Sequence, residues 1–188
     1  MLLVWAFVQA FSPAPAIAAM WDIDQLMQAL AKAPPGRATF TEKKTFALLD
    51  RPVDSSGELL YKPPDRLEKR TVKPKPETMV AEGGTLTLER PPRTFTLQLQ
   101  EQPELAGFID SIRGTLAGDR KVLERSFRLQ LEGPAERWTL TLFPINEKMA
   151  ANVHLIRIGG TQAEVRSVDV IQTDGDRSAM VITRREAR

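Results

Sequence analysis

Cysteine is absent from the 188-residue sequence, and histidine and tyrosine each occur once. Without cysteine the chain has no disulfide, no thiol nucleophile and no attachment point for an N-terminal lipid anchor. At this length folding buries about 70% of the surface of the unfolded chain, so a core without disulfides is feasible. The formal net charge is only +2. Because charges of both signs are interspersed, the composition gives little support for nucleic-acid binding.

Residues 1–19 have the pattern of a cleaved secretory signal peptide. An apolar run at 2–8 is followed by a proline-containing break at 12–15 and by small residues at 16–19. The run is shorter than the ~20 residues that a membrane-spanning helix needs. No lysine or arginine precedes it, and an apolar first helix of the folded domain is the alternative interpretation. We expect an exported mature domain at residues 20–188 that is free to diffuse outside the inner membrane.

Hydrophobic spacing predicts a mainly β (α+β) domain. Two amphipathic helices are expected at residues 21–32 and 103–116, and Asp119 is placed to cap a short helix that continues to residue 123. Alternation with period two predicts ten strands, at 39–48, 57–62, 67–72, 85–90, 93–100, 127–131, 138–143, 153–158, 164–171 and 178–183. Turns are expected at Pro63-Pro64, Pro74–Pro76, Gly83-Gly84, Pro91-Pro92, Gly159-Gly160 and Asp174-Gly175. The order of elements predicts one antiparallel sheet with helical insertions at the start and middle of the chain.

The side chains that enzymes use for catalysis are scarce. His154 alternates with apolar neighbours in a predicted strand, which favours a solvent-facing position, and no G-x-S-x-G or H-E-x-x-H motif is present. Asp174-Gly175-Asp176 is similar to the start of a calcium loop but lacks the other oxygen ligands, and a hairpin turn explains it. Asp22 and Asp24 fall in the first turn of a predicted helix, where carboxylates are favourable without any catalytic role. We therefore expect no enzyme, no cofactor and no metal site.

The predicted sheet has more apolar positions than two helices cover on a flat face. If the sheet curls, the helices lie inside it or across its mouth, and the space between is an apolar cavity. The inner face of the lid helix would carry Leu105, Phe108, Ile109 and Ile112. The strand positions opposite would be Phe40, Leu59, Tyr61, Leu86, Leu88, Phe95, Leu97, Trp138, Leu140 and Leu142. An ordinary filled core uses the same residues, so the pattern leaves both interpretations open.

Four segments of the chain occur in the order of a known family. Residues 38–43 (ATFTEK) are close to its first-strand pattern F-x-Q, and residues 56–64 (SGELLYKPP) are similar to its G-x-L-x-x-x-x-P hairpin. Residues 138–144 (WTLTLFP) look like its W-x-L-x-L-x-P strand, and residues 168–178 are similar to its final hairpin. From Trp21 to roughly residue 183, the chain therefore resembles the LolA-like family of periplasmic outer-membrane lipoprotein carriers.

The resemblance implies a fold and a function. The fold would be a single unclosed antiparallel β-barrel, or curved sheet, whose apolar cavity is lidded by helices and accepts acyl chains. The protein would be a monomeric periplasmic carrier that takes lipidated protein or lipid from an inner-membrane exporter and delivers it to an outer-membrane acceptor. Burial of acyl chains, at ~0.8 kcal/mol per CH₂, would hold the cargo during transit.

Two positions depart from the family pattern. Pro63 stands where family members commonly have an arginine that helps hold the lid shut, and Glu42 stands where the first strand usually has glutamine. These departures extend the expected cargo to a non-protein amphiphile, such as a glycolipid or an acylated pigment. A lipid-sensing regulatory domain on the same scaffold is the other interpretation.

Overall fold

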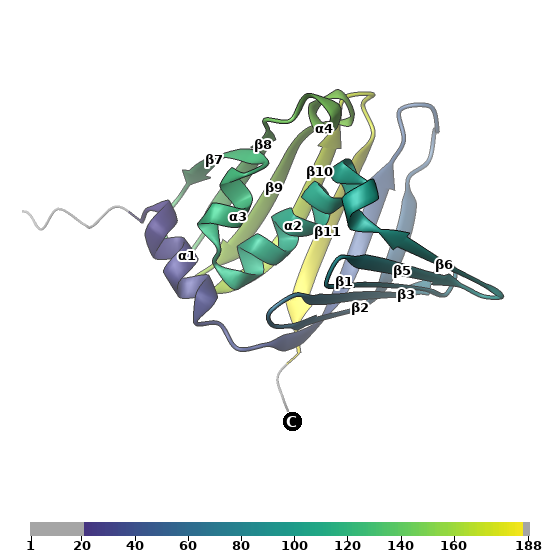
Figure 1. The fold of residues 1–188 in the computed structure, drawn as a ribbon, viewed down its shortest axis with the longest axis horizontal. Helices are drawn as coiled ribbons and strands as arrows, with labels where there is room; N and C mark the ends of the chain where they lie inside the picture. Colours follow the sequence, from purple (N-terminus) through teal and green to yellow (C-terminus); the bar gives the residue numbers. More distant parts are fainter. Residues whose placement is uncertain (1–20, 186–188) are drawn as a thin grey trace, which may run out of the picture.

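The structure, a computed structural model, describes residues 21–185 and is dominated by one long curved sheet (Figure 1). The expected signal peptide at residues 1–19 lies outside the described residues, as do residues 186–188. The helices in the described part are α1 (Ile23–Ala31), α2 (Pro103–Ala117), α3 (Arg120–Glu124) and α4 (Glu147–Asn152), with a 3₁₀ turn η1 at Leu99–Glu101. The strands are β1 (Gly36–Thr45), β2 (Val53–Lys62), β3 (Arg66–Lys73), β4 (Glu77–Glu82), β5 (Thr85–Arg90), β6 (Arg93–Gln98), β7 (Phe127–Glu132), β8 (Trp138–Pro144), β9 (Val153–Thr161), β10 (Glu164–Gln172) and β11 (Arg177–Arg184).

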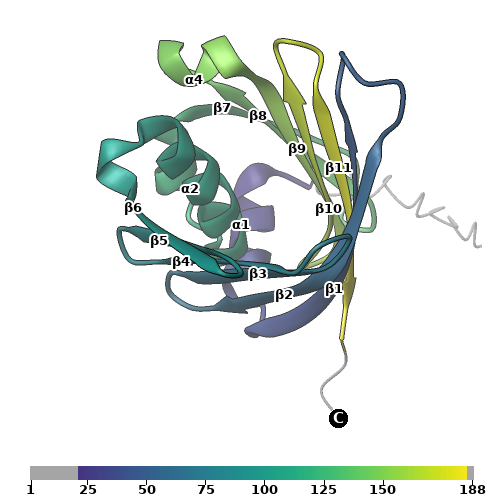
Figure 2. The same cartoon turned by 90° about the vertical axis from the view of Figure 1, so that its right-hand side faces the viewer.

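All neighbouring strands of the sheet are antiparallel, in the order β6-β5-β4-β3-β2-β1-β11-β10-β9-β8-β7. The first and last strands of the chain pair with each other in the middle, where Phe40 lies opposite Ile182. The two edge strands, β6 and β7, are not hydrogen-bonded to each other. Figure 2 shows that the sheet curls around α1 and α2. The predicted single, unclosed, curved antiparallel sheet is confirmed.

The helices inside the curl begin and end at residues suited to these positions. Asp22 caps α1 in a capping box, since its carboxylate accepts from the Gln25 amide at 2.8 Å and its own amide donates back to the Gln25 side chain. Helix α2 begins with Pro103 and ends at Gly118, whose φ of +63° favours glycine. A side chain at position 118 would also collide with the carbonyl oxygen of Met27. This glycine therefore allows α1 and α2 to pack closely.

Two groups of buried apolar side chains lie between the helices and the sheet. The larger group, which we call the main core, joins α1, α3 and α4 to β7, β8, β9 and β10. Its buried members are Leu26, Met27, Leu30, Leu123, Phe127, Trp138, Leu140, Leu142, Met149, Ile156, Ile158 and Val168. The smaller group, the minor core, contains Ala81, Leu86, Leu99 and Ile109. Phe108 of α2 packs against both groups, so this helix connects them.

Several elements differ from the sequence-based expectation. Strand β1 spans Gly36–Thr45 rather than residues 39–48, and β2 begins at Val53 rather than at residue 57. Residues 77–82 form an eleventh strand, β4, which was not predicted because E-T-M-V-A-E does not alternate strictly and follows two prolines. Residues 147–152 form the short helix α4, which buries only Met149 and so has no helical periodicity to detect. Strand β6 ends at Gln98 rather than at residue 100, because Leu99 turns into η1 and enters the minor core.

The expected turn at Gly159-Gly160 is wrong. Both glycines lie within β9, and the turn is at Gln162, which has a φ of +50°. Gly160 is paired with Trp138, and a side chain at position 160 would collide with the indole ring. The indole N–H donates to the carbonyl of Gln162 at 2.9 Å. The glycine therefore serves the packing of a tryptophan and not the reversal of the chain.

Candidate functional site

The predicted lining residues of the strands fall on one face of the sheet, the concave face that the helices cover. Leu86 packs against Ile109 of α2 in the minor core, and its register partner on β6 is Leu97. Leu88 is paired in the same way with Phe95. Phe40, Leu59 and Tyr61 share this face through the β1–β2 register, and Trp138, Leu140 and Leu142 share it through the main core. The structure therefore brings all the predicted strand positions onto the inner surface of the curl.

The two ends of the concave face differ in how closely they are covered. Trp138, Leu140 and Leu142 are at most 1% exposed, and they pack in the main core with α1 and α3. Along this part of the sheet the side chains fill the interior as an ordinary core does. These three residues, predicted as part of a cavity wall, leave no exposed surface for a ligand.

The strands β5 and β6 present an open apolar surface instead. Phe95 and Leu97 are 45% and 39% exposed, although both point to the concave face. Leu88, Leu59 and Tyr61 are half-buried, as are Leu105, Phe108 and Ile112 of α2, whereas Leu86, Phe40 and Ile109 are buried. We call the concave surface formed by Leu88, Phe95 and Leu97 with Leu105 of α2 the open apolar surface. Exposed aromatic and aliphatic side chains beside a buried cluster are typical of a binding surface.

A buried carboxylate lies between these two regions. Glu42 is only 7% exposed, and its carboxylate accepts hydrogen bonds from the Lys69 ammonium at 2.6 Å and from the hydroxyls of Ser178 at 2.7 Å and Ser55 at 3.1 Å. The Lys69 nitrogen also lies 4.8 Å from the centre of the Phe40 ring. Burial by itself would raise the pKa of Glu42, but the hydrogen bonds from Lys69 and Ser178 and the charges of Lys69 and Lys44 hold that pKa below its usual value. The group is thus a satisfied ion pair inside the concave face.

Helix α2 is attached to the sheet by an arginine that was not predicted. Arg113 donates from Nη1 to the carbonyl of Gly83, in the β4–β5 turn, at 2.9 Å. Its Nε and Nη2 are buried and have no hydrogen-bond partner among residues 21–185. Arg113 lies four residues after Ile109 and three before Leu116, so a charged residue within the apolar stripe was the signal available in the sequence. Pro63, the departure noted above, lies in the β2–β3 turn.

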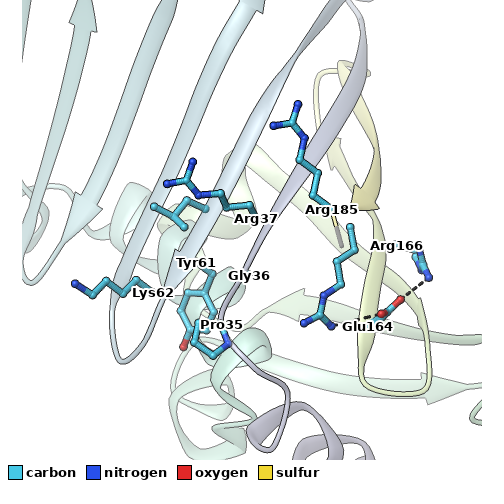
Figure 3. A pocket seen from close by; sticks show the side chains of 10 residues that line it. Pro35, Gly36, Arg37, Tyr61, Lys62, Glu164, Arg166 and Arg185 are labelled. Carbon is cyan, nitrogen blue, oxygen red and sulfur yellow. Dashed lines mark hydrogen bonds and ion pairs between the residues drawn. The ribbon is translucent and has the colours of Figure 1, made fainter. Parts of the chain in front are cut away.

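A cavity of 880 Å³ lies at the end of the sheet where β1 and β10 begin and β2 and β11 end (Figure 3). Its charged lining consists of Arg37, Lys62, Arg166, Arg184, Arg185 and a single carboxylate, Glu164. Tyr61 forms part of the wall, and burial raises the pKa of its hydroxyl while the charge of Arg113 opposes that rise. None of these basic residues was predicted as a site, because they come from four separate strands.

The polar residues considered as catalytic or metal-binding candidates lie on an exposed strand position and in a turn. His154 is exposed on β9, and residues 174–176 form the β10–β11 turn, as predicted. Within that turn the Asp176 amide donates to the Asp174 carboxylate at 2.9 Å, and the Asp176 carboxylate accepts from the Ala47 amide. Within residues 21–185, no group of three or more histidine, aspartate or glutamate side chains is arranged to hold a metal ion. No helix in the same range has the length and apolar character needed to cross a bilayer.

Comparison with solved structures finds several similar chains. A LolA superfamily protein of Nitrosomonas europaea is 9% identical, with 87% of this chain and 93% of that chain covered and a TM-score of 0.43. The lipoprotein LppX of Mycobacterium tuberculosis is 7% identical, with 88% and 96% covered and a TM-score of 0.41. A chain of the MucA/MucB complex of Pseudomonas aeruginosa is 12% identical, with a TM-score of 0.46; 89% of this chain but only 59% of that one is covered.

No curated protein matches this chain. A family model matches residues 14–185, which is nearly the whole sequence, and its description is "Outer membrane lipoprotein carrier protein LolA-like". This match agrees with the segments at 38–43, 56–64 and 138–144 and with the unclosed sheet that they build. The chain belongs to the LolA-like family of outer membrane lipoprotein carrier proteins.

Proposed function

We propose that this protein is an extracytoplasmic carrier that holds the acyl chains of a lipid or lipoprotein on its open apolar surface. Membership of the LolA-like family supports lipid or lipoprotein binding in general. The observation that carries the proposal is the exposure of Phe95 and Leu97 on the concave face, directly beside the buried Leu86 and Ile109. An acyl chain placed there would bury surface that the protein itself leaves uncovered.

The energetics of this site suit reversible binding. Each methylene transferred from water to an apolar surface contributes ~0.8 kcal/mol, so a chain that is only partly covered binds with moderate affinity. Helix α2 lies over the minor core and contacts the sheet through Phe108 and Arg113. We expect its displacement to uncover more of the apolar face when cargo enters. Cargo would come from an inner-membrane exporter and pass to an outer-membrane acceptor, both outside this chain.

A binding experiment tests the site. Leu97→Glu places a charge on the open apolar surface and should weaken binding of a fluorescent fatty acid by at least about tenfold, because the carboxylate would be desolvated under the acyl chain. Val181→Glu is the matched control: Val181 is 58% exposed and lies between Met180 and Ile182, which pack on the main core, so it faces the convex side. The control should bind within about twofold of the unmodified protein.

Two results would contradict the proposal. The first is unmodified protein that binds no fatty acid and shows no co-purifying lipid by mass spectrometry. The second is an equal loss of binding in both variants, which would mean that the acyl chain does not use the concave face. A separate assay of fluorescent-lipid transfer between donor and acceptor vesicles distinguishes the carrier from a lipid-sensing regulatory domain, since a sensor binds lipid without accelerating its transfer.

A further inference from the structure

The cavity at the end of the sheet concentrates positive charge. Among the described residues, five basic side chains line it, and Glu164 is the only acidic one. Figure 3 shows Arg37 and Lys62 on one side of the cavity and Arg166 with Glu164 on the other. Cations that converge on a concave surface repel one another and attract an anion, because the low-dielectric walls focus their field.

The ion pairs formed within residues 21–185 leave part of this charge without a partner. Glu164 is shared between Arg166 and Arg184, the latter at 3.4 Å, and Arg185 pairs with Glu58 at 2.9 Å. Neither Arg37 nor Lys62 makes a side-chain hydrogen bond or ion pair with any residue of the range 21–185. Within residues 21–185, the cavity therefore has two exposed cationic groups that an added anion can engage without breaking an ion pair.

The cavity also adjoins the inside of the curl. Tyr61 lines it and shares the concave face with Leu59, two residues earlier on β2. Leu60 and Lys62, which alternate with Tyr61, line the same cavity from the opposite side of the strand. The cavity thus reaches the concave face at Tyr61, and a polar group bound in it can continue past Tyr61 to an apolar chain beside Leu59.

We propose that this cavity binds the phosphate of an anionic lipid headgroup, with Arg37 and Lys62 as the principal contacts. A guanidinium presents parallel N–H donors that match phosphate oxygens, and an ammonium adds a compact point charge beside it. The volume of 880 Å³ suits a headgroup with its glycerol, and is within the range of small-molecule sites. This inference rests on the proposed function, and it narrows the cargo to lipids that carry a phosphate.

Calorimetric titration of matched lipids tests the assignment. Dioctanoyl phosphatidic acid and dioctanoylglycerol have the same chains and differ in the phosphate. The unmodified protein should bind the phosphatidic acid at least about tenfold more tightly, which corresponds to about 1.4 kcal/mol. In the variant Arg37→Glu/Lys62→Glu, the affinities for phosphatidic acid and dioctanoylglycerol should differ by no more than about twofold, while the affinity for dioctanoylglycerol stays unchanged.

The control variant is Lys73→Glu/Lys75→Glu, which alters the net charge by the same amount. Lys73 ends β3 and Lys75 follows it, at the opposite end of the sheet from the cavity, and both are exposed. This variant should keep the full preference for phosphatidic acid. If this control loses as much of the preference for phosphatidic acid as the cavity variant does, general electrostatic attraction accounts for the binding and the assigned site is wrong. Arg37→Gln/Lys62→Gln gives the same test, without charge reversal, if the glutamate variant does not fold.

The remaining outcomes separate this inference from the proposed function. If dioctanoylglycerol binds but the phosphate adds no affinity, the headgroup site is wrong and the carrier function stands. If neither lipid binds, the proposed function itself fails. Inorganic phosphate is the last probe: it should bind at least about tenfold more weakly than phosphatidic acid. Equal affinity would identify a site for free phosphate and overturn the lipid assignment.

Discussion

Apolar side chains alternate along the strands in the same way in both halves of the sheet, but they are buried in one half and partly exposed in the other. In the half formed by β7 to β10, strand β8 places Trp138, Leu140 and Leu142 under α1 and α3, where they are almost fully buried. Strands β5 and β6 place Phe95 and Leu97 on the same concave face, where they are partly exposed. The difference lies in what covers them. Helices α1 and α3 both pack on the half formed by β7 to β10, whereas among the described residues only α2 and η1 close the minor core. A filled core and a binding surface are therefore parts of one continuous sheet.

The largest expected effect is on the filled half. Leu140→Ala removes a fully buried side chain from the main core and should lower the free energy of unfolding by about 2–5 kcal/mol, through lost apolar transfer and the cavity left behind. Leu97→Ala is the same chemical change on the open half and should cost less than about 1 kcal/mol, because that side chain is already 39% exposed. Urea denaturation of both variants measures the difference. Equal losses would mean that the two halves do not differ as described.

An intermediate effect is expected at the junction of the two halves. Lys69→Met leaves the carboxylate of Glu42 buried without its closest cation and should lower the free energy of unfolding by about 1–3 kcal/mol at neutral pH. The side chain of Lys69 is itself partly exposed, which keeps the cost below that of breaking a fully buried pair. Lys43→Met, on an exposed position of the same β1 strand as Glu42, is the control and should be neutral within about 0.5 kcal/mol.

The pH dependence of this variant gives a sharper test. Because the folded-state pKa of Glu42 is lowered, its contribution to stability is present above the unfolded pKa and is lost as the pH falls through the folded pKa. Removing Lys69 raises the folded-state pKa of Glu42, so the stability of the variant falls less on acidification than that of the unmodified protein. The stability difference between the two proteins should shrink as the pH is lowered from 7 towards about 4. A difference independent of pH would show that Lys69 acts through packing and not through the charge of Glu42.

The sequence predicted the sheet well because alternation is a local property. The helices at 21–32 and 103–116, the proline and glycine turns, and nearly all strands follow from residues close together in the chain. Strand β4 could not be predicted, since its stability comes from pairing with neighbouring strands. Helix α4 could not be predicted because Met149 is its single buried residue. The sequence also could not decide between core and cavity, because that depends on where α1 and α3 lie in space.

The charged part of the site was harder to predict for the same reason. Glu42 and Lys69 are 27 residues apart, and they approach each other only across β2. The basic residues of the end cavity come from β1, β2, β10 and β11 and from Arg185 directly after β11, so no stretch of sequence shows them as a cluster. Arg113 was the exception. A charged residue within an apolar helical stripe is visible in the sequence, although its partner, the Gly83 carbonyl, is not.

The smallest expected effect on stability is at the contact that joins α2 to the open half. Arg113→Leu removes the hydrogen bond to the Gly83 carbonyl, but it also removes two buried nitrogen donors, Nε and Nη2, that have no partner within residues 21–185. The lost bond and the relieved desolvation oppose each other, so global stability should change by less than about 1 kcal/mol. The local effect should be larger: backbone amides of α2 and of the β4–β5 turn should exchange with deuterium faster, while those of α1 and β8 stay protected. Faster exchange throughout the chain would show that Arg113 supports the whole fold, whereas unchanged exchange in α2 would show that Phe108 and Ile109 hold the helix without it.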